Sequence, residues 1–186
     1  MNTKRIVITG GPGTGKTSVI DALKENDFYC YDEIIRAMTL AATKNTNPEV
    51  HISNPIDFVS DPKQFNTDLI NGRVANFNAA ELLVRDFCFF DRGIPDVLAY
   101  MDFFNQTYDT FFTDACSNHK YDMVFLLPPW KAIYKSDSER FESFEQAQQI
   151  HEHLVKTYQK FGYTIIEVPF DSINERRNFI LNSIIK

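Results

Sequence analysis

Residues 10–17 read Gly-Gly-Pro-Gly-Thr-Gly-Lys-Thr and match the pattern G-x-x-x-x-G-K-[ST]. An apolar run, Arg5 to Thr9, precedes this segment, and an amphipathic pattern from Thr14 to Asn26 follows it. Glycines allow backbone N–H groups to turn inward around an anion, and the start of a helix adds partial positive charge. The pattern therefore predicts a buried strand, a phosphate-binding loop and a helix in succession.

The ligand predicted for this loop is a nucleoside triphosphate, ATP or GTP, with Mg²⁺. We expect Lys16 to bridge the terminal phosphates and the hydroxyl of Thr17 to reach the metal ion, since Mg²⁺ keeps several waters and needs few protein oxygens. The predicted nucleotide-binding residues of the loop are Gly11, Pro12, Gly13, Thr14, Gly15, Lys16, Thr17 and Ser18.

Apolar runs and helical periods alternate from one end of the chain to the other. Strands are predicted at 5–9, 28–31, 88–90, 122–127 and 163–168, and helices at 14–26, 34–42, 62–85, 94–104, 143–161 and from 172 onward. Short β-branched or aromatic strands joined by helices imply a parallel sheet covered on both faces. The predicted fold class is α/β, with five parallel strands in three layers and one domain over residues 1–186.

Chain length and net charge limit the number of domains and the kinds of partner that we expect. The 186 residues suit one domain, and 19 basic against 25 acidic residues give a net charge of −6, which argues against nucleic-acid or acidic-membrane binding. No apolar run is long enough to span a bilayer, and no secretory signal is visible, so a cytoplasmic protein is expected. The cysteines, Cys30, Cys88 and Cys116, are odd in number and lie in apolar surroundings, which favours buried reduced thiols.

The residues after the other strands decide between classes of nucleotide-binding protein. Neither N-K-x-D nor D-x-x-G occurs where a guanine-specific switch would need it, and the third strand ends in Asp91-Arg92 where a hydrolytic ATPase would have an acidic pair. A guanidinium fixed there can hold an acceptor or a migrating phosphate, which favours phosphoryl transfer. Asp91 would orient the waters of the metal ion; alternatively, it caps a helix or pairs with Arg92.

These residues resemble the thymidylate kinase and deoxynucleoside kinase superfamily through the phosphate loop, Asp91-Arg92-Gly93 and an acidic residue after the second strand. Over nearly the whole chain, they resemble more closely the small AAA-like P-loop family that includes the nicotinamide-riboside kinase domain of NadR. The motifs of this resemblance are Glu33-x-x-Arg36, Arg73, Glu81, Asp91-Arg92-Gly93, Asp96, Pro128-Pro129-Trp130, Asp137-x-x-Arg140 and Val168-Pro169.

The resemblance implies a kinase-like P-loop fold with a short lid at about 129–142, and it implies roles for individual residues. Glu33 matches the base that takes the proton of the acceptor hydroxyl, although adjacent Asp32 could serve instead, or Glu33 could pair with Arg36. Arg140 matches a lid arginine that closes on the transferring phosphates. Val168 and Pro169 match the place where the purine rests.

Four further residues are candidates for the acceptor pocket, in addition to Asp32 and Arg92. They are Arg36, Arg73, Glu81 and Asp96, each of which could instead form a surface ion pair. The leading hypothesis is a Mg²⁺-dependent P-loop kinase, with a nucleoside triphosphate and a small nucleoside-like acceptor as its partners. The alternatives are a nucleotide-sensing regulatory module and a simple ATPase or GTPase.

Overall fold

The computed structural model describes residues 3–35, 38, 61–134 and 142–184. Five parallel strands form one sheet in the order β2-β3-β1-β4-β5. Their bounds are β1 Lys4–Thr9, β2 Cys30–Tyr31, β3 Phe87–Asp91, β4 Met123–Leu126 and β5 Ile165–Glu167. The predicted α/β class and the parallel sheet are therefore confirmed, and each strand overlaps its predicted range.

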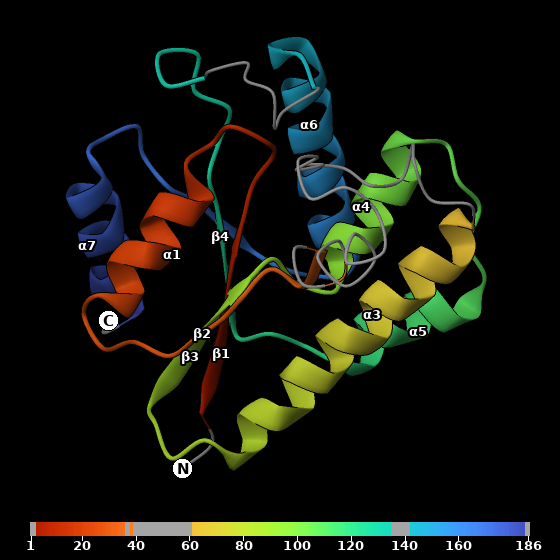
Figure 1. Cartoon of the computed structure of the whole chain (residues 1–186), viewed down its shortest axis with the longest axis horizontal. Coiled ribbons are helices and arrows are strands. Elements are labelled where there is room, and N and C mark those ends of the chain that lie inside the picture. The colour runs from red at the N-terminus through yellow and green to blue at the C-terminus, as the bar shows by residue number, and fades with distance from the viewer. Residues whose placement is uncertain (1–2, 36–37, 39–60, 135–141, 185–186) are drawn as a thin grey trace, which may run out of the picture.

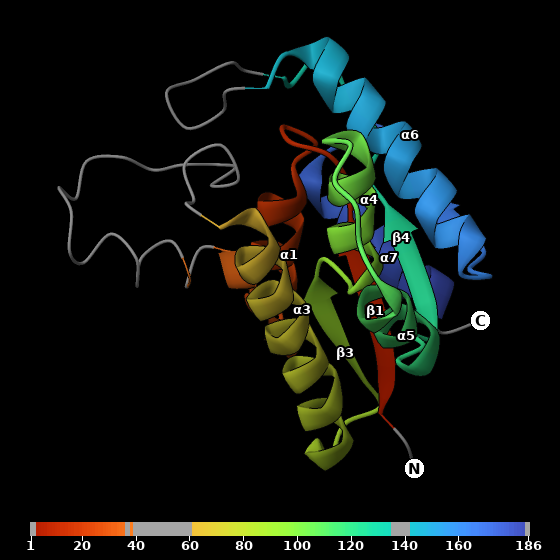
Figure 2. The same ribbon diagram turned by 90° about the vertical axis from the view of Figure 1, so that its right-hand side faces the viewer.

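Helices cover both faces of the sheet (Figure 1). Helices α1 and α7 lie on one face, while α3, α4, α5 and α6 lie on the other, and Figure 2 shows α3 and α4 in front of the sheet with α7 behind it. The helices are α1 Lys16–Lys24, α3 Pro62–Ala79, α4 Pro95–Phe103, α5 Thr110–Asn118, α6 Phe144–Lys160 and α7 Ile173–Ile184.

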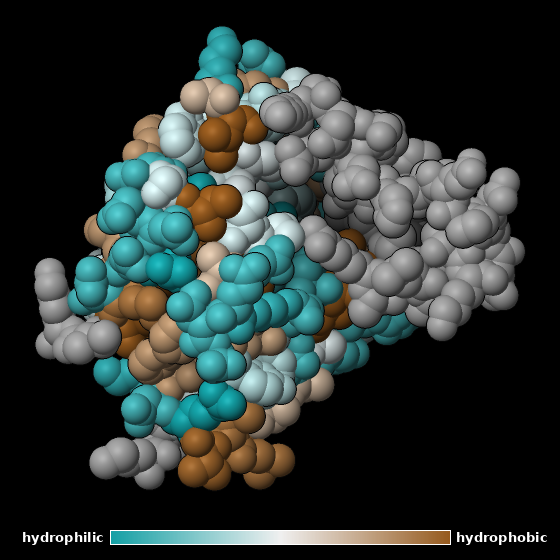
Figure 3. All heavy atoms as spheres, turned by 60° about the vertical axis from the view of Figure 1, so that its left-hand side comes forward, coloured by the Kyte–Doolittle hydropathy of each residue, from teal (hydrophilic) through white to brown (hydrophobic). Residues whose placement is uncertain are grey.

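Alternation along the strands fills two separate cores. In β1, Ile6 and Ile8 pack with α1 and α7, whereas Val7 points to the opposite face and packs with α4 and α6. All three side chains are completely buried. The view onto the α1 and α7 side of the molecule shows hydrophobic residues as separate patches among hydrophilic ones (Figure 3). The two cores therefore pack both faces of β1 against four helices, α1 and α7 on one side and α4 and α6 on the other.

Local capping sets several helix ends. Asp61 accepts the backbone N–H of Gln64, with Pro62 in the first turn of α3, and Ser143 and Gln146 form a reciprocal capping box at the start of α6. The predicted continuation of α3 to Arg85 is wrong: α3 ends at Ala79, and a short 3₁₀ turn covers Ala80–Leu82 before β3.

Helix α5 is absent from the sequence prediction. Its signals are readable in retrospect, since the carboxylate of Asp109 accepts the N–H of Phe111, and Phe112, Ala115 and Cys116 fall on one buried face. Cys88 and Cys116 are buried and Cys30 is half-buried, and all three are free thiols, as predicted. Across the described residues, no helix is both long enough and apolar enough to cross a bilayer.

Candidate active site

The phosphate loop joins β1 to α1 at the carboxyl edge of the sheet. Its own side chains close it, because the Thr14 hydroxyl donates to the Gly11 carbonyl at 2.9 Å and the Lys16 ammonium donates to the same oxygen at 3.2 Å. Gly15 has a φ of +83°, in the left-handed region, at the point where the chain enters α1. Gly11 and Thr14 are buried, while Thr17 and Ser18 are exposed at the first turn of the helix.

The ammonium group of Lys16 is the positive charge of the phosphate loop, and its surroundings disfavour that charge. Burial, followed by repulsion from the guanidinium of Arg92, lowers the pKa of the Lys16 ammonium to about 7, although the carboxylates of Asp91 and Glu33 act in the opposite sense. A lysine in this state gains a proton when an anion arrives beside it. The loop is therefore prepared for a phosphate that brings its own negative charge.

The residues after β2 and β3 form a buried cluster of charges beside the loop. The carboxylate of Glu33 bridges two guanidinium groups, with Oε1 at 3.0 Å from Nη2 of Arg73 and Oε2 at 2.5 Å from Nε of Arg92. Arg73 also donates to the carbonyl of Gly93. Three predicted site residues from α3, the end of β2 and the end of β3 are thus brought together, with side chains no more than 12% exposed.

Arg92 adopts a backbone conformation that costs energy. Its φ is +74°, and residues other than glycine adopt such values rarely, at a cost of about 1–2 kcal/mol. The backbone N–H of Arg92 donates to the carbonyl of Ile8 at 3.0 Å, which fixes this turn to the end of β1. Burial acts to lower the pKa of Arg92, but the nearby groups Tyr100, Glu33 and Asp96 hold this pKa above its ordinary value.

Asp96 lies behind this cluster and is 1% exposed. Oδ1 accepts from the hydroxyl of Thr9 at 2.5 Å and from Nη1 of Arg92 at 3.2 Å, while Oδ2 accepts from the hydroxyl of Tyr158 at 2.5 Å and from the N–H of Gly93 at 2.9 Å. Four protein donors therefore occupy the buried carboxylate of Asp96, which is not among the residues that line the pocket described next, and its role in acceptor binding stays a prediction.

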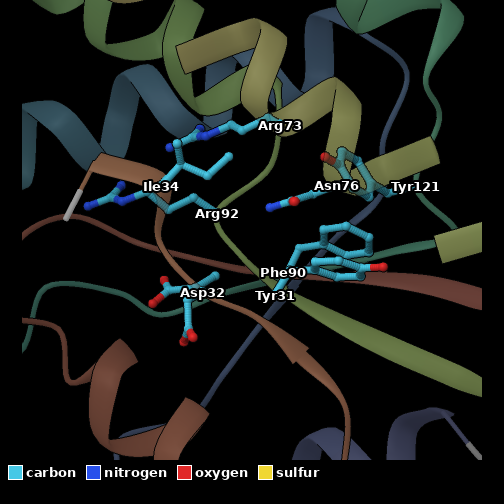
Figure 4. A pocket seen from close by; sticks show the side chains of 9 residues that line it. Tyr31, Asp32, Ile34, Arg73, Asn76, Phe90, Arg92 and Tyr121 are labelled. Atoms are coloured by element: carbon cyan, nitrogen blue, oxygen red, sulfur yellow. The ribbon is translucent and has the colours of Figure 1, made fainter. Parts of the chain in front are cut away.

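A pocket opens beside the charge cluster (Figure 4). The rings of Tyr31 and Phe90 stack at 4.8 Å with an interplanar angle of 16°, and both line it. The other lining residues are Asp32, Ile34, Arg73, Asn76, Asp91, Arg92 and Tyr121. Asp32 is largely exposed and pairs with Lys24. Among the described residues, this pocket places aromatic rings, amide and charged groups next to the end of β3.

The remaining predicted residues divide into three groups. Glu81 lies away from the charge cluster, in the 3₁₀ turn before β3, where it pairs with Arg5 near the start of β1 at the opposite edge of the sheet. Val168 is completely buried in the core against α1 and α7, so it makes no surface for a purine here, and Pro169 beside it is exposed. Arg36 and Arg140 lie outside the described residues.

Two residues at the phosphate loop were not predicted from the sequence. A Cβ atom on Gly13 would lie 2.6 Å from the ring of Tyr134, and one on Gly15 would lie 2.8 Å from Nη1 of Arg176. Tyr134 and Arg176 therefore contact different glycines of the phosphate loop, although both are far from it in the sequence. Trp130 stacks on Phe170 at 5.3 Å, which joins the loops after β4 and β5. Tyr134 and Arg176 are distant from the loop in the sequence, so no local sequence pattern indicates that they contact it.

Comparison with known proteins places this geometry in a family. A family model described as an AAA domain matches residues 5–176. The chain belongs to this AAA domain family. The matched range of the AAA domain includes the phosphate loop and every residue of the charge cluster. A search of curated proteins finds no match by sequence.

Solved structures share the fold of this AAA domain at low sequence identity. A structure of NadR protein in complex with NR superposes with a TM-score of 0.70 at 14% identity, covering 98% of this chain and 50% of that one, so the AAA domain spans half the length of NadR. Deoxyadenosine kinase from M. mycoides with bound dATP gives 0.62 at 14% identity over 98% and 100% of the chains. Thymidylate kinase from Ehrlichia chaffeensis gives 0.64 at 13% identity over 100% of both.

Proposed function

We propose that this chain is a P-loop phosphotransferase that moves the terminal phosphoryl group of ATP or GTP to a hydroxyl of a small, nucleoside-like acceptor. The observation that carries the proposal is the position of Arg92, which is held by Glu33 and Asp96 at the strand end beside the phosphate loop. A hydrolytic ATPase is expected to have a carboxylate there to activate water, whereas a fixed guanidinium neutralises the charge of the phosphoryl group during transfer. Proteins of the same fold that are named as kinases support it.

In the transfer, the bond from the γ-phosphorus to the bridging oxygen breaks and a bond to the acceptor oxygen forms. The nucleoside diphosphate leaves, and the hydroxyl proton passes to a base. Lys16 and the backbone of the phosphate loop hold the donor phosphates, and Arg92 faces the transferring group from the end of β3. Arg140 of the lid, which lies outside the described residues, completes the set in this proposal.

A Mg²⁺ ion suits the oxygen donors at this edge of the sheet. Thr17 is an exposed residue in the first turn of α1, and Asp91 ends β3 at the register position opposite Ile8 of β1. A hydroxyl and a carboxylate are the few protein oxygens that Mg²⁺ needs beside phosphates and water. Thr17 and Asp91 would hold the ion, which supplies charge neutralisation for the phosphates.

Glu33 and Asp32 are the two carboxylates available as the base. Glu33 is bound by two guanidinium groups, which fix its position. In this proposal it orients the acceptor hydroxyl and accepts the hydroxyl proton late in the transfer. A late proton transfer suffices because the transition state of phosphoryl transfer is loose. Asp32 lines the acceptor pocket and is open to solvent. Glu33→Gln should lower kcat by about a hundredfold or more, and Asp32→Asn by less than tenfold. The opposite order would assign the base to Asp32.

The acceptor is proposed to lie in the pocket between Arg92 and the stacked rings of Tyr31 and Phe90. An aromatic wall and the amide of Asn76 suit a planar, hydrogen-bonding ring such as a nucleobase or a pyridine amide, which enters only if the lining side chains move apart, because the space between them is about 10 Å³, room for one water molecule. This class agrees with the NR and dATP named in the similar structures.

The test is nucleoside diphosphate production from Mg-ATP and Mg-GTP, each alone and with a panel of nucleosides, nicotinamide riboside and nucleoside monophosphates. We expect turnover that rises steeply with one acceptor class. Arg92→Met should lower this turnover by at least a hundredfold with triphosphate affinity within about threefold. The matched control is Arg85→Met, since Arg85 is exposed and donates to the backbone of Asp27.

Other outcomes would refute the transfer. Turnover of triphosphate that is independent of every acceptor indicates an ATPase or GTPase. Different affinities for triphosphate and diphosphate without turnover indicate a nucleotide sensor. Equal activity of the Arg92→Met and Arg85→Met variants would remove Arg92 from the proposed mechanism.

A further inference from the structure

Arg176 places a guanidinium group directly behind the phosphate loop. It lies in the first turn of α7, where its backbone N–H donates to the carbonyl of Ser172 at 3.0 Å. Helices α1 and α7 pack together on the same face of the sheet (Figure 1). The Arg176 side chain, 2% exposed, reaches across this contact to the turn that starts α1.

The guanidinium contacts the loop at two points around one peptide unit. Nη2 donates to the carbonyl of Thr14 at 2.8 Å, and Nη1 lies 2.8 Å from the place where a Cβ on Gly15 would be. The Thr14 carbonyl and the Gly15 N–H belong to the same planar trans peptide, so they point in opposite directions. A bond that pulls on the carbonyl therefore holds the N–H on the other side of the peptide, and polarises it as a donor.

The charge of Arg176 has no protein counter-ion in the described part of the chain. None of the ion pairs there includes Arg176, and its buried Nε has no hydrogen-bond partner among those residues. Burial lowers the pKa of Arg176, but an arginine side chain stays protonated in proteins. A buried cation without a counter-ion destabilises a fold unless an anion compensates for it.

We propose that Arg176 is a positioning residue of the phosphate loop, which fixes the Thr14–Gly15 peptide and supplies buried positive charge for the phosphates of a bound nucleotide. It touches the loop rather than the ligand. The inference rests on the proposed function only in requiring that the loop binds a nucleotide, and phosphoryl transfer itself is not needed for it.

The test compares variants that keep or remove the charge. Arg176→Gln removes the charge and keeps a donor, and Arg176→Lys keeps the charge. Arg177→Gln is the matched control, since Arg177 is the next residue of the same helix and donates to the side chain of Asn178. Affinities of the full chain for Mg-ATP, Mg-ADP and adenosine are measured by titration calorimetry, together with Tm.

We expect Arg176→Gln to weaken Mg-ATP binding by at least tenfold, Mg-ADP by less, and adenosine by less than twofold, because a charge effect grows with the charge of the ligand. Arg176→Lys should stay within about threefold of the wild type for Mg-ATP. Arg177→Gln should match the wild type throughout. This dependence on phosphate number is what a purely structural residue would not produce.

Several results would overturn the proposal. Equal losses for ATP and adenosine, a loss in Arg176→Lys as large as in Arg176→Gln, or unchanged ATP binding in Arg176→Gln would each do so. If Arg176→Gln does not fold, Arg176→Met, which adds no buried polar group, replaces it, and failure of both to fold assigns the charge to stability alone. A wild type that binds ATP but transfers no phosphate refutes the kinase and leaves Arg176 as inferred.

Discussion

Replacing Asp96 with asparagine tests whether this buried carboxylate organises the end of β3. The carboxylate accepts four hydrogen bonds, from Thr9, Tyr158, Gly93 and Arg92. Asparagine offers one carbonyl oxygen in place of two, so about two of the four donors keep an acceptor, although the two hydroxyls can turn to accept from the new amide. Hydrogen bonds to charged groups contribute roughly 1.5–3 kcal/mol each, so we expect a loss of about 3 kcal/mol in the free energy of unfolding.

Urea unfolding at pH 7 measures this loss, and the corresponding fall in Tm is roughly 6–12 °C for a chain of this size. Asp114→Asn is the matched control, because Asp114 is exposed on α5 and the same charge is removed there. If Asp96→Asn lies within about 1 kcal/mol of Asp114→Asn, the four hydrogen bonds do not carry the stability assigned to them.

The pH dependence of the same pair gives a second test. Burial alone would raise the pKa of Asp96, but the guanidinium groups of Arg73 and Arg92 and the hydroxyls of Thr9 and Tyr158 hold it below its ordinary value. A carboxyl whose folded pKa is lowered stabilises the protein above its unfolded pKa, and this contribution is lost as the pH falls through the folded pKa. The gap between wild type and Asp96→Asn should therefore be complete above about pH 5 and shrink below about pH 4.

Three further outcomes are expected. Because the pKa of Lys16 is lowered to about 7, binding of Mg-ADP should take up a proton and weaken by up to roughly twentyfold from pH 6.5 to 8.5, and Lys16→Arg should abolish that dependence in calorimetry. Gly15 and Gly162 have φ values of +83° and +80°, but of the two only Gly15 has a close neighbour where a Cβ would lie. Gly162→Ala should therefore lower the free energy of unfolding in urea by about 1 kcal/mol, and Gly15→Ala should lower it clearly more. Tyr158→Phe removes one donor to the buried carboxylate of Asp96 and should destabilise by about 2 kcal/mol, with a smaller loss contradicting a strong bond there.

Much of the fold follows from local pattern. Continuous apolar runs predict β1 and β4, and the capping residues Asp61 and Ser143 predict the starts of α3 and α6 within one residue. Helix α5 was missed even though its cap, Asp109, and its apolar spacing were visible. Local propensity does not show where a helix stops when tertiary packing decides it, which is why the end of α3 was predicted six residues too late.

The candidate site was predictable only where its residues follow strand ends. Glu33 is the second residue after β2 and Arg92 the first after β3, and a parallel sheet brings such positions together. Arg176 is 162 residues away from its partner Thr14, and nothing local distinguishes it from neighbouring Arg177. Glu81 was proposed through the family resemblance, and no local pattern shows that it pairs with Arg5 at the other edge of the sheet.

The stacking of Trp130 on Phe170 makes the protein its own optical reporter. The chain has one tryptophan, and the Trp130 carbonyl accepts the backbone N–H of Tyr134, whose ring lies against Gly13 of the phosphate loop. Tryptophan emission, excited at a wavelength that tyrosine does not absorb, therefore originates entirely at one edge of the sheet. Quenching or a spectral shift on mixing with a nucleotide would follow events at that edge in real time, without a dye and without contributions from any second indole.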